Sequence, residues 1–299
     1  MTSTDGTSTG GTGDDATRRG AVLVTGCSSG IGHATAARLV ADGHVVYATA
    51  RRPETLESLA AAGAHPLELD VTDESSMRTA VAEVEREHGA VGVLVNNAGY
   101  GEYGPVEEVP LEAVRRQFET NVFGLGRMCQ LVLPGMRAAG RGRIVNIGSM
   151  GGRITFPTGG WYHASKYAVE ALTDALRVEL STTGARAGCA YFGFIDTDLV
   201  RASFAQSSTQ TLQGNMPAFI RKPVPVGKAV DAIERAVDKR LARTWAPRFV
   251  GGFLALRGIL QPLSEKRLMG SPELAAAIAE ADAAGATEGD LGVAGQLVS

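Results

Sequence analysis

The chain has 299 residues, of which 44% are hydrophobic and 20% charged, and 32 acidic against 29 basic residues leave a net charge of −3. This composition excludes an intrinsically disordered chain, and the near-neutral balance argues against a nucleic-acid-binding protein. The three cysteines, Cys27, Cys129 and Cys189, show no CxxC spacing, so we expect neither a disulfide framework nor a metal site.

The two ends of the chain differ in composition from its middle. Residues 1–19 are almost free of apolar side chains, and we expect a disordered tail there. This tail lacks the basic start and apolar run of a signal peptide, so we expect a cytoplasmic protein. Residues 271–299 hold five acids and no Lys or Arg, and we expect a short helix over Pro272–Ala284 within an acidic, partly disordered tail. A single catalytic domain is expected over residues 20–270.

Short apolar segments alternate with helical patterns between the tails. The expected strands are Ala21–Thr25, His44–Thr49, His65–Leu69, Gly92–Val95, Arg143–Ile147 and Arg186–Phe192. The expected helices end at Asp42, begin after Pro53, and cover Asp73–His88, Leu111–Arg137 and Trp161–Leu180. Uniformly apolar short strands separated by helices are typical of a parallel sheet covered on both faces. We therefore predict an α/β fold, a single doubly wound parallel sheet of the Rossmann type, with ligands beyond the carboxyl ends of the strands.

A glycine-rich turn, TGCSSGIG at residues 25–32, joins the first expected strand to a helix. Glycine lets the backbone turn sharply and approach a ligand, and the helix start offers free N–H groups and a positive dipole end to a pyrophosphate. The spacing GxxxGxG differs from the GxGxxG fingerprint, and a purely structural turn is the alternative. Its place at the first strand–helix junction favours phosphate binding.

Three motifs occur in a fixed order: TGCSSGIG, NNAG at residues 96–99, and YxxxK from Tyr162 to Lys166. Together they resemble the compact single-domain branch of the short-chain dehydrogenase/reductase family over about residues 20 to 240, and YGEYGP after NNAG resembles its retinol- and hydroxysteroid-type members. The resemblance implies NAD(P) as cofactor. The residues it places at the cofactor are Gly26, Ser28, Ser29, Gly30, Ile31, Gly32, Asp70, Val71, Asn97, Ala98, Gly99, Tyr162, Lys166, Ile195 and Thr197. For Asp70, a helix N-cap is the alternative role.

The end of the second expected strand, HVVYATARRP, indicates which dinucleotide is bound. An NAD enzyme places a carboxylate there to hold the ribose 2′-hydroxyl, but this chain has Ala50 followed by Arg51 and Arg52. An arginine pairs with a 2′-phosphate, and Ser29 and Ser28 are further donors. A solvated turn is the alternative role of the arginines. We predict NADP(H) as the cofactor, with Arg51 at the phosphate.

Four residues match the catalytic set of the family: Asn121 in TNVFG, Ser149 in NIGSMGG, Tyr162 and Lys166. Tyr162 and Lys166 are four apart and share one helix face. A free tyrosine titrates at about 10, and a nearby ammonium lowers the pKa, so we expect Lys166 to lower that of Tyr162. The resemblance implies that Tyr162 is the general acid or base, that Ser149 polarises the substrate oxygen, and that Lys166 holds the nicotinamide ribose. Asn121 is expected to position, through its main chain, a water that relays protons.

One position departs from the family pattern. The usual Pro-Gly after the sixth strand is Phe192-Gly193 here, and we expect the loss of proline to loosen this turn. Ile195 and Thr197, which match positions at the nicotinamide carboxamide, follow the turn directly.

Apolar and aromatic residues near the catalytic segments predict a hydrophobic secondary alcohol, ketone or aldehyde as substrate. They are Tyr100, Tyr103, Met150, Phe156, Trp161 and, in a loop at about residues 198–226 that we expect to act as a lid, Phe204, Leu212, Met216 and Phe219. One alternative is a 3-oxoacyl-thioester reductase, which would use basic residues at the mouth: Arg153, Arg201, Arg221 and Lys222. A non-catalytic NADPH-binding regulator is the alternative of another class.

Residues 249–260, FVGGFLALRGIL, are apolar except for Arg257, and this run is too short to cross a bilayer, which takes about 20 residues. Residues 240–270 hold six basic residues and one acid, Glu265, a local charge of +5. An apolar helix with basic flanks fits an anionic membrane surface. The favoured alternative is that Arg243–Ala246 ends the sheet and the next helix packs on the core or on another subunit of a homo-oligomer.

Overall fold

The computed structural model describes residues 20–198, 200–201, 218–269, 271–276 and 279–280. Three predictions lie wholly or largely outside these residues: the tail at 1–19, the loop with Phe204, Leu212 and Met216, and the acidic tail after residue 280. Residues 272–276 and 279–280 are helical, within the helix expected over Pro272–Ala284.

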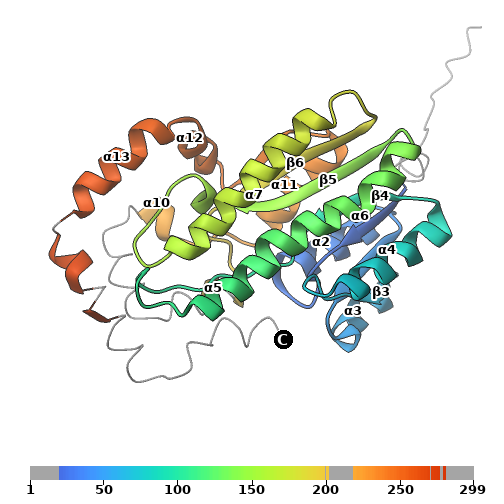
Figure 1. Ribbon diagram of the computed structural model, residues 1–299, viewed down its shortest axis with the longest axis horizontal. Helices are drawn as coiled ribbons and strands as arrows, with labels where there is room; N and C mark the ends of the chain where they lie inside the picture. Colours follow the sequence, from blue (N-terminus) through green and yellow to red (C-terminus); the bar gives the residue numbers. More distant parts are fainter. Residues whose placement is uncertain (1–19, 199, 202–217, 270, 277–278, 281–299) are drawn as a thin grey trace, which may run out of the picture.

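Seven parallel strands form one sheet in the order β3-β2-β1-β4-β5-β6-β7, as the alternating pattern predicts (Figure 1). The strands are β1 (Ala21–Val24), β2 (Val46–Ala50), β3 (His65–Glu68), β4 (Val91–Asn96), β5 (Gly142–Ser149), β6 (Ala185–Phe192) and β7 (Arg243–Ala246). The strand order reverses between β1 and β4, and a crevice opens at such a reversal beyond the carboxyl ends of the strands.

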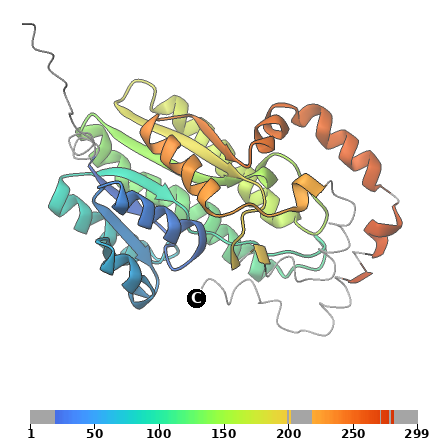
Figure 2. The ribbon, with the colours of Figure 1, turned by 180° about the vertical axis from the view of Figure 1, so that it is seen from behind.

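Helices cover both faces of the sheet (Figures 1 and 2). Helices α2 (Gly30–Ala41), α3 (Glu57–Ala61) and α11 (Gly227–Asp238) bury Leu39, Leu59 and Ile233 in one apolar cluster with Val22 and Val24 of β1. Helices α4 (Glu74–His88), α6 (Leu125–Ala138) and α7 (Gly160–Glu179) bury Met77, Met128 and Val169 in a second cluster with Leu23 and Leu94. Alternate residues of β1 thus serve opposite faces, as the pleat of a strand requires.

The helix expected over Leu111–Arg137 is interrupted by a π-helical turn. It consists of α5 (Leu111–Phe118), the π-turn η2 (Glu119–Gly124) and α6. A Cβ on Gly124 would overlap the Val71 carbonyl oxygen, so the wide turn lies directly against the end of the β3 segment. Apolar periodicity does not register a π-turn, because such a turn changes the pitch only locally.

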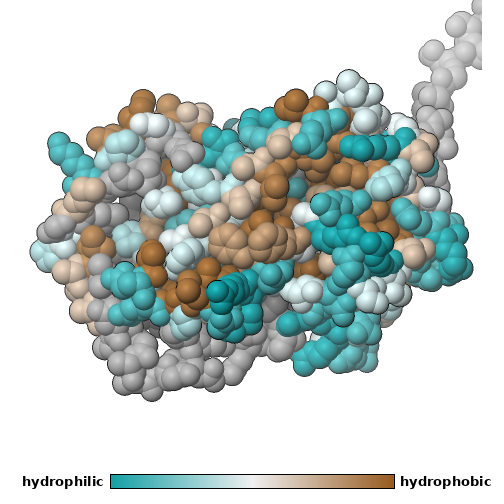
Figure 3. Space-filling model, in the orientation of Figure 1, coloured by the Kyte–Doolittle hydropathy of each residue, from teal (hydrophilic) through white to brown (hydrophobic). Residues whose placement is uncertain are grey.

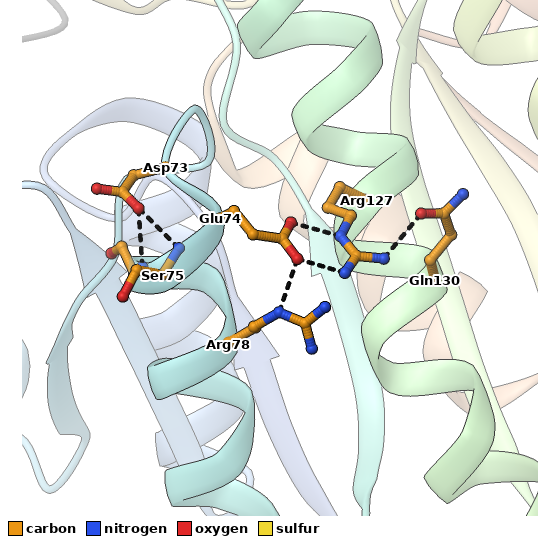
Figure 4. Close-up of polar contacts among 7 residues, drawn as sticks. Asp73, Glu74, Ser75, Arg78, Arg127 and Gln130 are labelled. Atoms are coloured by element: carbon orange, nitrogen blue, oxygen red, sulfur yellow. Dashed lines mark hydrogen bonds and ion pairs between the residues drawn. The ribbon is translucent and has the colours of Figure 1, made fainter.

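The start of α4 is capped and tied to α6 (Figure 4). The Asp73 carboxylate accepts hydrogen bonds from the Ser75 and Ser76 N–H groups at 2.7 and 3.2 Å, so Asp73, rather than Asp70, is the N-cap. Glu74 accepts from Arg127 of α6 and from Arg78, and the two guanidinium groups lower the pKa of Glu74 to about 2.

A chain of buried polar side chains fastens α7 to the middle of the sheet. Asn96 Nδ2 at the end of β4 donates to Asn146 Oδ1 of β5 at 2.9 Å, and Asn146 Nδ2 donates to Thr173 Oγ1 of α7, also at 2.9 Å. All three residues are buried, so an unpaired member would lose solvation without a replacement.

Asn146→Ala should therefore lower the free energy of unfolding by about 2–4 kcal/mol. It removes the donor to the Thr173 hydroxyl and the shortest acceptor of the Asn96 amide, which keeps only the longer contacts to the Leu125 carbonyl oxygen and Cys129 Sγ at 3.4 and 3.3 Å. Urea denaturation followed by circular dichroism measures the loss. The exposed Gln130→Ala is the matched control. A loss no larger than that of the control would show that this chain does not hold α7 in place.

Candidate active site

A cavity of about 700 Å³ opens at the carboxyl ends of the strands. All but two of the residues predicted to bind cofactor or catalyse line it. Those at the wall are Gly26, Ser28, Ser29, Gly30, Ile31, Arg51, Asp70, Val71, Asn97, Ala98, Gly99, Ser149, Tyr162, Lys166, Ile195 and Thr197. The two that do not reach the wall, Gly32 and Asn121, support it from behind.

The glycine-rich turn forms a cradle that only glycine can build. Gly26 has φ +71°, and a Cβ there would lie 2.9 Å from the Ala98 Cα. A Cβ on Gly32 would overlap the Gly26 carbonyl oxygen. Helix α2 begins at Gly30, so its free N–H groups and positive dipole end face the cavity that the turn encloses.

The NNAG segment holds this cradle in position. Asn97 Nδ2 donates to the Thr25 and Gly26 carbonyl oxygens at 3.0 and 2.9 Å. In return, Thr25 Oγ1 accepts hydrogen bonds from the N–H groups of Asn97 and Ala98, both at 3.0 Å. The two motifs therefore form one unit at the crevice between β1 and β4.

The end of the cavity next to β2 is positively charged. Ala50 stands at the strand end, and Arg51 and Arg52 line the wall after it. Ser29 precedes α2, but its hydroxyl does not cap the helix, which leaves it available to a ligand. Asp70 Oδ1 accepts from the Thr72 N–H and hydroxyl at 2.8 and 2.7 Å, and these bonds order the turn after β3.

The cavity wall also holds charged residues that were not predicted from the sequence, Glu119 and Asp198 among them. Glu102 and Arg116 also line the cavity, and Arg116 comes from α5. Burial raises the pKa of Glu102, while the guanidinium of Arg116 acts in the opposite direction. No motif marks either residue, because they meet only when the loop after β4 folds back on α5.

The three catalytic candidates that reach the cavity come from β5 and α7. Ser149 ends β5, and its Oγ accepts from the Gly151 N–H at 3.0 Å. Tyr162 and Lys166 lie in the first two turns of α7. Lys166 Nζ donates to the Ile147 carbonyl oxygen at 3.1 Å and lies 5.9 Å from the centre of the Tyr162 ring.

The pKa of Tyr162 differs from our prediction. Burial raises it above the ordinary value, and only the hydrogen bond with Ser149 lowers it. Lys166 does not reverse this, because its ammonium donates to Ile147 and is itself destabilised by burial, which lowers the pKa of Lys166 to about 8. The prediction that Lys166 lowers the pKa of Tyr162 is therefore wrong for this structure.

Asn121 lies inside the π-turn and is buried. Its Oδ1 accepts from the Tyr100 N–H at 3.0 Å, and its Nδ2 donates to the Tyr100 carbonyl oxygen at 2.7 Å and to Ser165 Oγ at 3.1 Å. The side chain thus joins the loop after NNAG to α7. Its predicted main-chain role in a proton relay stays a prediction.

Backbone contacts hold the turn after β6, where Phe192 replaces the usual proline. Gly193 N–H donates to the Ala246 carbonyl oxygen at 2.9 Å, and Ile195 forms a parallel bridge with Val224. These contacts keep Ile195 and Thr197 at the cavity wall, and a Cβ on Gly30 would meet the Thr197 methyl group at 3.5 Å. The effect of Phe192 in place of the usual proline on the stiffness of this turn stays a prediction.

Aromatic residues adjoin Tyr162. The Tyr103 ring lies 5.4 Å from the Tyr162 ring, centre to centre. The buried His163 accepts from the Phe156 N–H at 3.2 Å, and burial lowers the pKa of His163 to about 4, so the ring is neutral at pH 7. Trp161 does not line the cavity: its Nε1 donates to the Val106 carbonyl oxygen at 3.1 Å, and its ring packs on the cluster around Val109.

The buried ammonium of Lys166 predicts a measurable dependence of stability on pH. The pKa of Lys166 falls from 10.5 to about 8 on folding, so the folded state binds fewer protons than the unfolded state between these values. Lys166→Met should therefore gain up to about 3 kcal/mol of stability relative to the parent at pH 7, and this gain should shrink as the pH rises from 8 to 10.5. Urea unfolding across pH 7 to 10.5 tests it. A difference that does not change with pH would contradict the burial of a charged amine.

Residues 20–208 match the family model described as short chain dehydrogenase. A 3-ketodihydrosphingosine reductase from Bacteroides thetaiotaomicron is 45% identical over 159 residues, 53% of this chain and 58% of that protein. An NADPH-dependent 3-dehydrocapnine reductase from Ornithobacterium rhinotracheale is 40% identical over 171 residues, 54% of this chain and 60% of that protein.

Among solved structures, a short-chain dehydrogenase from Sphingobium yanoikuyae in complex with NADPH superposes with a TM-score of 0.67 and 30% identity, covering 82% of this chain and 95% of that one. The finer resemblance to retinol- and hydroxysteroid-type members is not confirmed, since the relatives above have other names. The family model, the seven-stranded parallel sheet and the solved neighbour agree: the chain belongs to the short chain dehydrogenase family.

Proposed function

We propose that the protein is an NADP(H)-dependent oxidoreductase that interconverts a hydrophobic ketone and its secondary alcohol, with Tyr162 as general acid or base. The observation that carries the proposal is one cavity whose wall holds both the glycine cradle and the pair of Tyr162 and Lys166. A protein that only senses a dinucleotide needs the cradle, but has no use for a buried phenol beside a buried amine.

The residues present fit a dinucleotide phosphate. Gly26, Gly30 and the start of α2 offer a backbone surface free of Cβ atoms to a pyrophosphate. At the β2 end, Arg51 and the Ser29 hydroxyl, which does not cap α2, are suited to bind a 2′-phosphate. Ala50 stands where a carboxylate would repel that phosphate. The nicotinamide, when bound, supplies the hydride.

The side chains of this protein would handle the proton and the orientation. The raised pKa of Tyr162 keeps its phenol protonated at neutral pH, the state needed to donate a proton to a carbonyl oxygen during reduction. Ser149, hydrogen bonded with Tyr162, is a second donor for the same oxygen. Lys166, whose ammonium lies at the cavity wall, would hold the ribose hydroxyls of the bound nicotinamide nucleotide.

The apolar surroundings support a hydrophobic substrate. The wall that holds Ser149 and Tyr162 also holds Tyr100, Ile147, Phe192 and Ile195. Met150 and Phe156, which we predicted at the substrate, belong to a core cluster and do not line this cavity. The names of the two curated relatives, a 3-ketodihydrosphingosine reductase and a 3-dehydrocapnine reductase, point in the same direction, towards a keto compound as substrate.

The acyl-thioester alternative is weakened by ion pairs. Arg153 pairs with Glu170, and Arg201 pairs with Asp196 and Asp198, so two of the four basic residues proposed for a carrier phosphate are already neutralised.

Tyr162→Phe is expected to lower kcat for ketone reduction by about 10²- to 10⁴-fold and to change the Kd for NADPH less than about threefold, because only the proton donor is removed. Tyr103→Phe is the matched control, since its ring lies against the Tyr162 ring. NADPH absorbance gives the rate and NADPH fluorescence the affinity. If Tyr103→Phe proved as inactive as Tyr162→Phe, the assignment of the donor would be wrong.

Arg51→Ala should weaken NADPH binding by about 1–3 kcal/mol and leave NADH binding nearly unchanged, because a single charge-assisted contact to the 2′-phosphate is lost. Fluorescence titration with both nucleotides measures the two effects. Arg78→Ala, an exposed arginine on α4 paired with Glu74, is the control for the loss of one positive charge. Equal weakening of NADPH and NADH would show that Arg51 does not contact the phosphate.

A further inference from the structure

Helices α12 (Phe249–Ala255) and α13 (Arg257–Leu268) lie at one end of the molecule, beyond β7 (Figures 1 and 2). The inner side of α12 belongs to the core. Val250 is fully buried in the cluster of Met150 and Tyr191, and Phe249 and Phe253 pack against it. Since Met150 follows Ser149, α12 adjoins the catalytic end of the sheet. The apolar run at 249–260 thus packs on the core in its first half, as the favoured alternative predicted.

Large apolar side chains are exposed along α13 and at its two ends. Leu256 is 51% exposed, Ile259 62%, Leu263 59% and Met269 72%. Ile259 and Leu263 are four residues apart and share one face of α13, and the Ile259 N–H donates to the Leu256 carbonyl oxygen at 2.9 Å, which places Leu256 one turn before them. Figure 3 shows hydrophobic residues along the upper left edge, over α12 and α13. Exposed apolar residues concentrated in this way mark an interaction surface.

Basic side chains border this apolar face. Arg240 and Arg243 do not contribute, because Arg240 donates to the Gly142 and Gly184 carbonyl oxygens and Arg243 pairs with Asp174. Residues 248–269 still hold four basic residues and one acid, and Glu273 follows them. Arg248, Lys266 and Arg267 are exposed: Arg248 precedes the apolar residues in the chain, and Lys266 and Arg267 lie between Leu263 and Met269.

We propose that the exposed face of α13 and its two ends, with Leu256, Ile259, Leu263 and Met269 together with the exposed cations Arg248, Lys266 and Arg267, docks on the surface of an anionic lipid bilayer. Apolar side chains on one face of an interfacial helix enter the boundary between headgroups and acyl chains, while flanking cations meet lipid phosphates. No helix among the described residues is long and apolar enough to span a bilayer, and docking requires none.

Docking through this face would place the catalytic end of the sheet near the membrane. The inner side of α12 contacts the cluster next to Ser149, so a docked protein would hold its catalytic end close to the lipid. A hydrophobic ketone dissolved in the bilayer would then be captured without crossing bulk water. This last step rests on the proposed function, whereas docking itself depends only on the surface.

The test is flotation of the full-length protein with vesicles of phosphatidylcholine, with or without phosphatidylglycerol, at low and high salt. We expect binding to the anionic vesicles only, falling as salt is raised. Ile259→Ser/Leu263→Ser should reduce binding at least about fivefold by removing apolar contacts. Lys266→Gln/Arg267→Gln should reduce it about tenfold or more, because each cation near an anionic surface contributes to affinity.

Matched controls change similar residues elsewhere. Val178→Ser removes an apolar side chain of α7 that is 67% exposed. Lys228→Gln/Lys239→Gln removes two exposed cations, one in α11 and one at its C-terminal cap. Both controls should bind vesicles as the parent does. All variants should keep the thermal unfolding midpoint of the parent and its rate of NADPH oxidation with a water-soluble ketone.

Docking would be overturned if the parent protein did not bind vesicles at low salt, or if test and control variants lost binding equally. In the first case, light scattering of the Ile259→Ser/Leu263→Ser variant shows whether this variant dissociates into smaller species than the parent. Such dissociation would identify the face as a contact between copies of the chain. Vesicle binding without any ketone reduction would contradict the proposed function and leave docking standing.

Discussion

The position of α7 relative to the ends of β4 and β5 is the constraint on which the site depends. Asn96, Asn146 and Thr173 connect these three elements through buried hydrogen bonds that cannot be exchanged for water. Ser149 ends β5, while Tyr162 and Lys166 lie on α7, so a rotation or slide of α7 would separate the hydroxyl from the phenol. Polar bonds specify this arrangement more tightly than apolar packing would, because their geometry tolerates little displacement.

The same end of the sheet carries an energetic conflict. Lys166 is buried, and its ammonium donates a hydrogen bond to the Ile147 carbonyl oxygen. Burial is the main reason that its pKa is lowered. A charge buried in this way destabilises the fold. Buried groups with strongly shifted pKa values are concentrated at functional sites of proteins. The buried Tyr162 adds no charge of its own, because burial raises its pKa and the phenol stays neutral at pH 7. A negatively charged ligand in the cavity would relieve the amine.

Much of this architecture could be predicted from the sequence, because its signals are local. The apolar strands, the glycine cradle and the spacing of Tyr162 and Lys166 all depend on residues close together in the chain. The predictions that failed concern side-chain directions and contacts between residues far apart in the chain. The side chain of Trp161 turns towards Val106 rather than the cavity, and Arg116 reaches the cavity from α5. The pKa of Tyr162 follows the depth of burial, which no spacing reveals. The π-turn escaped detection because apolar periodicity averages over a whole helix.

That π-turn has a consequence for how the chain tolerates change in length. A π-turn accommodates one residue more than an α-helical path of equal span. Deleting one residue between Glu119 and Gly124 would let α5 and α6 join as a continuous α-helix of equal span, so both helices would keep their orientation on the sheet. The residues of the turn itself would move, and Asn121 would leave the Tyr100 backbone and Ser165. The extra residue therefore serves the contacts of the turn, and a one-residue deletion here should disturb helix packing less than a deletion in the regular part of α6.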